Sequence, residues 1–217
     1  MPTLLVPQDV AHEFDRYDLD ASNGLLYAAL NAAPHPTDLA PLLAHEVPAG
    51  YRLVRIDNRL EPVAHERFEV ALLCDTTHRV AYYNQVIVTG YQDLNHRPAT
   101  QVLVWRSTAF QHEAVLHQLA RAVFFDYLLE NYDVLVSDNQ QTYEGQRFWL
   151  TQMSRALGLQ LFVYHYHLIS TELVQLRQET DIQALRAVAW GGEQDHAHHL
   201  VIISKLELPA QLNVEAA

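Results

Sequence analysis

A short apolar segment in the second half of the chain is followed by a polar run that holds several titratable side chains. The segment 133–138, DVLVSD, has the compact apolar pattern of a buried strand. Asp138 ends this segment, and Tyr143 and Glu144 follow closely in the sequence. Because α/β folds bind ligands at the carboxyl ends of their strands, this junction is a candidate ligand site. The polar side chains at 137–139 can instead cap the turn that follows, so both interpretations stay open.

A second polar set precedes the longest helical pattern of the chain. Arg106, Ser107 and Thr108 stand at the end of the strand-like segment 100–107. A guanidinium group and two hydroxyl groups can contact a phosphate, whereas serine and threonine also cap helices. Phosphate contact and capping are therefore alternatives at these residues.

Histidines occur in two pairs with a spacing of two residues, His165 with His167 and His196 with His198. Side chains two apart in a strand share a face, and imidazole nitrogens bind zinc. On neighbouring strands the two pairs would form a four-nitrogen site. A polar loop whose histidines bind nothing is the alternative, and we expect no metal.

Cys74 is the single cysteine, so an intramolecular disulfide is impossible. It follows Ala71-Leu72-Leu73, and no motif of a nucleophilic cysteine surrounds it. We therefore interpret Cys74 as a small buried apolar side chain.

The formal net charge is −12, with much of the acidic excess in residues 1–49. Proteins that bind nucleic acid need a basic face, so no direct nucleic-acid partner is expected. The acidic segment is either a solvated surface or a docking surface for a cationic partner. The start of the chain lacks a signal-peptide pattern, and no run is apolar enough to span a membrane. We therefore expect a soluble, cytoplasmic protein with no membrane partner.

Hydrophobic periodicity predicts helices first and strands next, followed by an alternation of the two. We expect a helix at 22–33 with Ser22 as a possible cap, and a second short helical stretch from 35 to about 50. The predicted strands are 51–57, 68–75, 79–92, 100–107, 133–138, 159–167 and 199–208. The other predicted helices are 112–132, 146–157 (closed by Gly158) and 170–186. The sequence thus predicts an α/β fold with a mixed, partly antiparallel sheet covered by helices.

This order of elements resembles that of the GNAT (GCN5-related N-acetyltransferase) superfamily. That family has a strand, two helices and an antiparallel meander, then α, β, α and two final strands. The resemblance implies one GNAT-like domain over 1–217, with an acidic helical part at 1–49, mixed sheet and helices at 50–208 and a tail at 209–217. It also implies that strands 100–107 and 133–138 run parallel and splay apart, and that helix 112–132 connects them as a right-handed crossover.

The resemblance implies roles for the two polar sets. Asn139 matches an asparagine frequent at this junction, and with Arg106, Ser107 and Thr108 it would contact an acyl-CoA cofactor. Tyr143 is the candidate acid that protonates the leaving thiolate. Asp138 or Glu144 is the candidate base for the attacking amine.

The glycine-rich turn by which GNAT enzymes hold the diphosphate of acetyl-CoA is missing. The segment 106–113 has no glycine, and it contains Glu113. Three hypotheses follow. The first is a GNAT-like acyltransferase of unknown acceptor, acting on a small molecule or a protein, with an atypical cofactor loop. The second is a noncatalytic GNAT-like scaffold that binds a protein partner, and the third is a metal-dependent enzyme using the histidine pairs.

Overall fold

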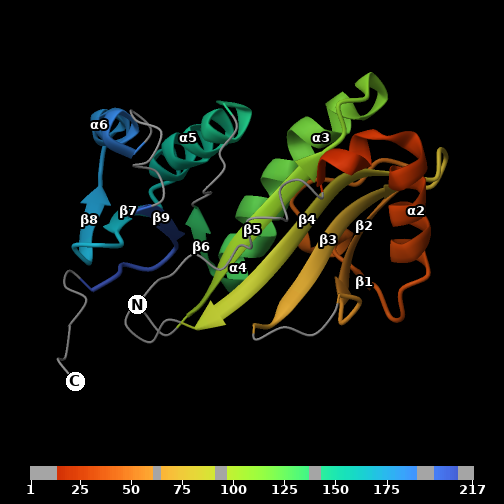
Figure 1. The fold of residues 1–217 in the computed structure, drawn as a ribbon, viewed down its shortest axis with the longest axis horizontal. Coiled ribbons are helices and arrows are strands. Elements are labelled where there is room, and N and C mark those ends of the chain that lie inside the picture. The colour runs from red at the N-terminus through yellow and green to blue at the C-terminus, as the bar shows by residue number, and fades with distance from the viewer. Residues whose placement is uncertain (1–13, 61–64, 91–96, 137–142, 190–197, 210–217) are drawn as a thin grey trace. The chain divides into compact units, whose positions relative to one another are not determined.

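The computed structural model describes residues 14–60, 65–90, 97–136, 143–189 and 198–209 (Figure 1). Its strands are hydrogen-bonded in the order β1-β2-β3-β4-β5-β6-β9-β7-β8, with helices between them in the sequence. The predicted α/β class with a mixed, partly antiparallel sheet is confirmed. No helix of the described residues is long and apolar enough to cross a membrane.

The chain divides into two compact units. The first comprises Asp9–Val88 and Val102–Glu130, and the second comprises Met1–Gln8, Thr89–Gln101 and Asn131–Ala217. The prediction of a single domain stays a prediction, and each unit is described by itself below.

The first unit is built on neighbouring strands of the sheet, among which the pairs β1–β2, β2–β3 and β3–β4 are antiparallel. The strands are β1 (Thr37–Asp38), β2 (Tyr51–Asp57), β3 (Arg67–Cys74), β4 (Arg79–Gly90) and most of β5 (Pro98–Arg106). Strand β3 pairs with β2 on one side and with β4 on the other, with an irregularity between Leu72 and Leu73. The strands predicted at 51–57, 68–75, 79–92 and 100–107 are thus confirmed with small changes at their ends.

Side chains alternate between the two faces of these strands. On β2, Tyr51 hydrogen-bonds to His112 and Arg55 to Tyr127, both on the long helix. Arg52, on the other face of β2, donates to Asn31 of helix α2. The two helices therefore lie on opposite faces of the same strands.

Helix α2 (Asp20–Asn31) confirms the first predicted helix, but its start differs from the prediction. The residue at its N-cap is Leu19, and no side chain caps it. Ser22 lies inside the helix, so its predicted capping role is wrong. The helix is instead fixed by the buried Asn23, which donates to Val80 O at 3.0 Å and accepts from Val80 N at 2.7 Å.

The second predicted helical stretch, from 35 to about 50, is wrong for most of its length. It holds the two-residue strand β1 and one 3-10 turn, η2 (Ala40–Leu42). Another 3-10 turn, η1 (Arg16–Asp18), precedes helix α2. Prolines at 36, 41 and 48 remove backbone donors, and this explains why a longer helix does not form.

The long predicted helix 112–132 is confirmed and runs from 110 to 131. It consists of α3 (Phe110–Ala122), the π-helical η3 (Val123–Leu128) and α4 (Leu129–Asn131). In the π-helical part, Tyr127 accepts a hydrogen bond from Arg55 at 2.8 Å, and Asp126 accepts one from Ala44 N at 3.2 Å. Sequence periodicity gave no sign of this π-helical turn.

The second unit contains β6 (Asp133–Val136), β7 (Phe162–His167), β8 (Glu172–Leu176) and β9 (His199–Ser204). Strand β6 pairs in parallel with β5, from Ala99 opposite Asp133 to Gln101 opposite Leu135. The other pairs in this unit, β6 with β9, β9 with β7 and β7 with β8, are antiparallel. The predicted parallel direction of 100–107 and 133–138 is therefore confirmed.

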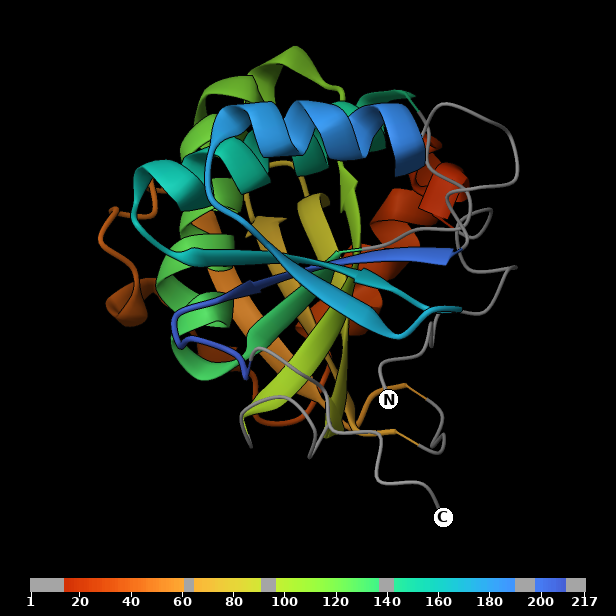
Figure 2. The ribbon, with the colours of Figure 1, turned by 90° about the vertical axis from the view of Figure 1, so that its left-hand side faces the viewer.

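Helices α5 (Tyr143–Gly158) and α6 (Glu179–Ala189) pack against each other, and α5 also packs against β7 (Figure 2). The buried core on the other face of the strands contains Tyr164, Tyr166, Leu200, Ile202 and Leu208. The side chains that alternate with these residues lie on the opposite face of the strands. They include His165, His167 and His199.

Two predictions for this unit are wrong. The helix predicted at 170–186 is a strand, β8, followed by α6, because the residues from 172 to 176 alternate in burial while the chain reverses at Thr171 (φ 58°). Gly158 was expected just beyond the end of a helix, but it is the last residue of α5, and the left-handed conformation falls on Gln160 (φ 59°). The strand predicted at 159–167 consequently starts only at Phe162, and the strand predicted at 199–208 ends at Ser204.

Candidate active site at the start of helix α3

The residues predicted to carry the chemistry are only partly described. Asp138 and Asn139 lie outside the described residues. Tyr143 and Glu144 open helix α5, and the positions of their side chains are outside the description too. Their catalytic and cofactor-binding roles stay predictions.

Arg106, Ser107 and Thr108 join β5 to α3 in the first unit. Ser107 N donates to Ala81 O at 2.9 Å, and Ser107 Oγ accepts from Ala109 N at 3.2 Å. The Ser107 hydroxyl thus stabilises the turn before the helix, while Ala109 at the N-cap makes no side-chain cap. Arg106 and Thr108 are exposed. Ser107 is therefore engaged in the turn before the helix and does not cap the helix itself.

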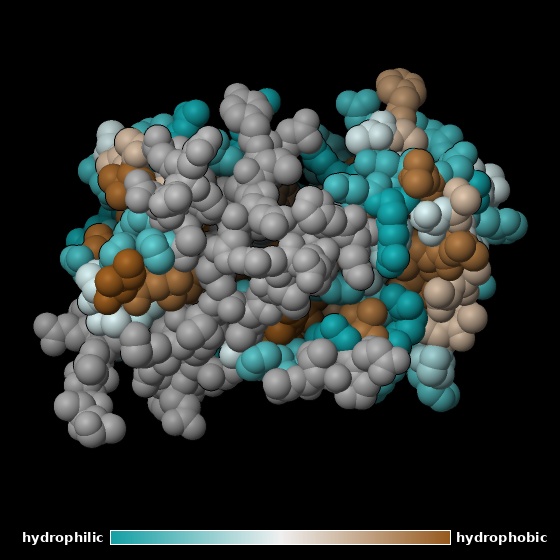
Figure 3. Space-filling view, viewed as in Figure 1, coloured by the Kyte–Doolittle hydropathy of each residue, from teal (hydrophilic) through white to brown (hydrophobic). Residues whose placement is uncertain are grey.

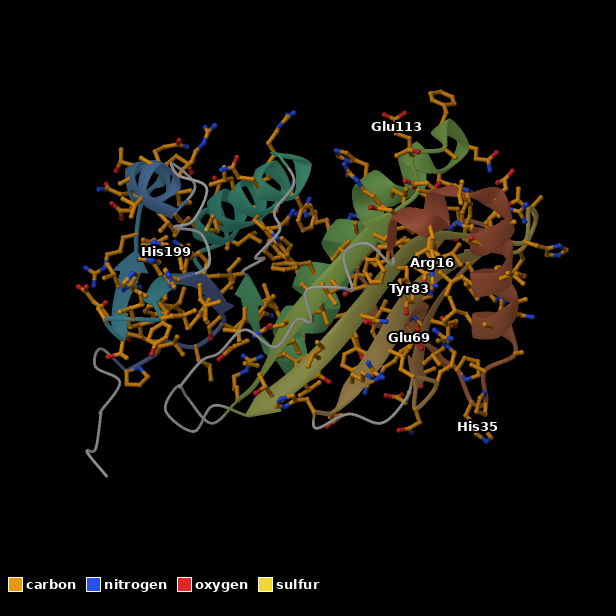
Figure 4. All side chains as sticks on the ribbon, in the orientation of Figure 1. Arg16, His35, Glu69, Tyr83, Glu113 and His199 are labelled. Atoms are coloured by element: carbon orange, nitrogen blue, oxygen red, sulfur yellow. The ribbon has the colours of Figure 1, made fainter. Side chains whose placement is uncertain are left out.

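The first turn of α3 is unsuited to a diphosphate. The positive end of a helix dipole attracts anions, but here Glu113 already provides a carboxylate in that turn. Figure 4 shows Glu113 at the outer end of the helix. The side chain of Phe110, the first residue of α3, is 88% exposed. An anion at this turn would meet both a like charge and an apolar ring.

A tyrosine and a histidine form a contact at the same turn. His112, buried in α3, has Nδ1 at 2.9 Å from the hydroxyl of Tyr51, which opens strand β2. The two rings meet edge to face, with centroids 5.8 Å apart. Neighbouring groups complete the set, because His112 Nε2 lies 3.3 Å from Gln111 Nε2 and Tyr51 Oη lies 3.4 Å from Gln111 O.

These contacts fix one consistent set of protons. The side-chain amide of Gln111 donates to His112 Nε2, so Nδ1 of a neutral imidazole carries the hydrogen and donates to Tyr51 Oη. The Tyr51 hydroxyl then donates in another direction, where Gln111 O is the acceptor at 3.4 Å. The tyrosine hydroxyl is consequently a proton donor that is itself supported by an N–H group.

Burial sets the protonation of both rings. It lowers the pKa of His112, which favours the neutral imidazole. Burial also raises the pKa of Tyr51, and the charge of and hydrogen bond to Cys74 raise it further. Tyr51 is therefore protonated at neutral pH, as a proton donor must be.

Cys74 is a free, buried thiol that stands opposite Tyr51 in the register of β2 and β3. Its burial agrees with the sequence interpretation of a small apolar side chain. Its contact with Tyr51 was not expected, because the pairing of the two strands brings together residues that are distant in the sequence.

Another buried polar group lies on the opposite face of the strands, where it serves the fold. Glu69 on β3 is 1% exposed, forms an ion pair with Arg59 and accepts a hydrogen bond from Tyr83 on β4 (Figure 4). Tyr83 in turn packs edge to face against Phe14 and Tyr17. Because each member is partnered, this group stabilises the packing and offers no open position for a substrate.

The histidine prediction is partly corrected in the second unit. His196 lies outside the described residues, and His198 is exposed, with its carbonyl accepting from Leu168 N at 2.8 Å. It is His199 that meets the first pair, with Nδ1 at 2.7 Å from His165 Nε2. Among the residues that the structure describes, no group of three or more His, Cys, Asp or Glu side chains is arranged to hold a metal ion as it stands.

The chain was also compared with known proteins. No family model matches it, and neither a curated protein nor a solved structure gave a match.

The Tyr51–His112 contact was missed by the sequence analysis. Tyr51 was assigned only to a strand and His112 only to a helix, and neither lies in a recognisable motif. One indication was present in the sequence: side chains alternate along a strand, so Tyr51 lies on the face opposite Arg52.

Proposed function

We propose that the chain is a GNAT-like acyltransferase of unknown acceptor, in which Tyr51 donates a proton to the leaving group of an acyl thioester such as acyl-CoA. The observation that carries the proposal is the Tyr51–His112 contact of 2.9 Å at the first turn of α3. The antiparallel strands β2 to β4, the long helix that follows β5 and the parallel pair of β5 with β6 support the same assignment.

The proposed chemistry is transfer of an acyl group from a thioester to an amine. The amine attacks the carbonyl carbon and a C–N bond forms, while the nitrogen releases one proton to solvent. The C–S bond breaks, and the sulfur leaves as a thiolate that needs a proton. The Tyr51 hydroxyl supplies that proton. The resulting phenolate is stabilised by the hydrogen bond from His112 Nδ1 until solvent protonates it again.

The donor must be held without the usual glycine-rich loop. Ser107 Oγ is engaged by Ala109 N, and Glu113 occupies the first turn of the helix. Of the three polar residues before the helix, the exposed Arg106 and Thr108 can contact a donor. The proposed compartment is the cytoplasm, which suits a chain whose single cysteine is a free thiol.

Tyr51→Phe tests the proposal, because it removes one hydroxyl and leaves the ring. We expect turnover of acyl-CoA with a panel of amines, followed by mass spectrometry, to fall by about 10²-fold, while stability changes by less than about 1 kcal/mol. The matched control is Tyr27→Phe, which removes another partly buried hydroxyl of the same unit, one that donates to Asp75 at 2.8 Å. It should leave turnover unchanged. Equal turnover in Tyr51→Phe and the natural chain would contradict the proposal.

A noncatalytic scaffold that binds a protein partner is the second candidate. It is favoured by the first turn of α3, where an exposed Phe110 and the Glu113 carboxylate stand at the start of the helix. Absence of transfer from every thioester tried would favour this candidate over the first.

A further inference from the structure

Three imidazoles come together on two neighbouring strands of the second unit. His165 and His167 share one face of β7, and His199 on β9 stands directly opposite His167 in the register. The ring centroid of His199 lies 5.0 Å from that of His165 and 5.0 Å from that of His167. Two ligands at alternate positions of one strand and a third from the next strand are suitably spaced to surround one ion.

We propose that His165, His167 and His199 form a binding site for a single divalent zinc-like ion, with solvent in the remaining position. The site lies in a different unit from Tyr51 and is independent of the acyltransferase proposal.

The contact between His165 and His199 supplies two of the ligands. His165 Nε2 and His199 Nδ1 are 2.7 Å apart and share one hydrogen. Zinc–nitrogen bonds of about 2.0–2.1 Å in a tetrahedral site put two ligand nitrogens about 3.3 Å apart. An ion that replaces the shared hydrogen therefore needs the two rings to separate by about half an ångström and to rotate until both lone pairs point at the ion.

The third ligand requires His167 to change its hydrogen bonding. Nδ1 of His167 now accepts from Ser170 N at 3.1 Å and lies 2.8 Å from Ser170 Oγ. This contact explains why the three rings do not converge as they stand. When Nε2 of His167 binds the ion, Nδ1 carries the hydrogen and donates it to Ser170 Oγ, a partner that fixes the orientation of the ligand. The released Ser170 N lies in an exposed segment, where water replaces its partner.

The surroundings of the three histidines also suit an ion. Glu172 on β8 is in register with His167, so a carboxylate accompanies the imidazoles from a third strand. The buried valines at 163 and 201 flank the histidines on the same face and limit the access of water.

The test uses the full chain made without a polyhistidine tag and stripped of metal with a chelator. We expect one equivalent of Co²⁺ to give the visible absorption of a tetrahedral ion, and Zn²⁺ to displace it and raise the melting temperature. His199→Gln should lower the Zn²⁺ affinity by about 10²-fold or more, whereas His117→Gln, a matched change at an exposed histidine of α3, should leave it unchanged.

Two outcomes overturn the proposal. One is the absence of saturable Zn²⁺ binding at neutral pH. The other is binding that survives in His199→Gln, since this would assign the ion to histidines elsewhere in the chain. If His199→Gln does not fold, His167→Gln replaces it, because His167 lies next to the exposed turn of the hairpin, and its affinity must fall in the same way.

Discussion

Single side chains in this protein owe their chemistry to partners that the sequence does not place near them. Tyr51 is a plain strand residue until His112 and Cys74 are brought to it, one by the helix and the other by the neighbouring strand. His165 was recognisable as one of a pair, but its partner His199 depends on β9 lying beside β7. Residue types were therefore predictable, whereas their combinations required the order of the strands.

His165 should make the fold sensitive to acid. Its pKa is about 4 in the folded chain and about 6.5 in an unfolded one, so between these values the unfolded chain binds a proton that the folded chain does not. The contribution of His165 to the free energy of unfolding therefore falls as the pH drops from about 6.5 to 4, and this contribution is constant above that window. Since the side chain is only partly buried, we expect a loss of about 1–3 kcal/mol.

Urea unfolding with a chelator present, at pH 7.5 and pH 5, measures this effect. His165→Gln removes the titrating group, so its stability should fall less between the two pH values than that of the natural chain. His117→Gln, at an exposed position, should behave as the natural chain does. Identical pH dependence in His165→Gln and the natural chain would show that other groups carry the effect.

At the scale of elements, most strands and the longer helices follow from periodicity, and the errors occur where two patterns compete. Alternating residues at 172–176 give β8, although the surrounding composition also suits a helix. The long helix passes through a π-helical turn at 123–128, in which Tyr127 and Asp126 accept hydrogen bonds from Arg55 and Ala44. These contacts are tertiary, and no local pattern announces them.

The end of helix α5 provides a test in which sequence and structure predict opposite signs. If Gly158 were the left-handed residue after the helix, Gly158→Ala would destabilise the fold by about 1 kcal/mol. In the structure it is the last helical residue, and an added Cβ meets nothing within 4 Å. Gly158→Ala should therefore raise the free energy of unfolding by about 0.5–1 kcal/mol.

Gln160 is the matched position, because it carries the left-handed conformation with φ 59°. Gln160→Gly should be neutral or stabilising by up to about 1 kcal/mol, since glycine adopts this conformation without strain. Chemical denaturation of both variants decides between the two descriptions. If Gly158→Ala and Gln160→Gly are both destabilising, the description expected from the sequence is correct, and Gly158 lies beyond the end of the helix.

For the whole molecule, the predicted class is correct, whereas the chemistry predicted at the junction after β6 stays a prediction and the Tyr51–His112 contact is a second candidate site. The polar junction at 137–144 was predicted as a ligand site because its polar residues are close together in the sequence. The Tyr51–His112 contact joins residues 61 apart in the sequence and forms only when helix α3 lies on β2. Local motifs are visible in a single sequence, but a site assembled by tertiary packing is not.

The net charge of −12 and the exposed ring of Phe110 bear on the choice between enzyme and scaffold. Figure 3 shows hydrophobic side chains at the surface among polar ones, and on the first unit the large exposed apolar side chains include Leu19, Leu25 and Phe110. Under the scaffold hypothesis, the expected partner offers an apolar pocket with basic residues around it.

If the protein is a scaffold, a photoreactive amino acid in place of Phe110 should cross-link in cells to one discrete partner with a basic surface. The same group in place of Val188, an exposed apolar side chain of α6, is the control and should give no such adduct. With the purified partner, the adduct should weaken as salt rises from about 0.05 to 0.5 M, because screening removes the attraction between opposite charges. An acyltransferase that acts on small amines should give no discrete adduct from either position. Adducts of equal yield from both positions would instead reflect nonspecific contact. The exposed Phe110 would then no longer support the scaffold hypothesis.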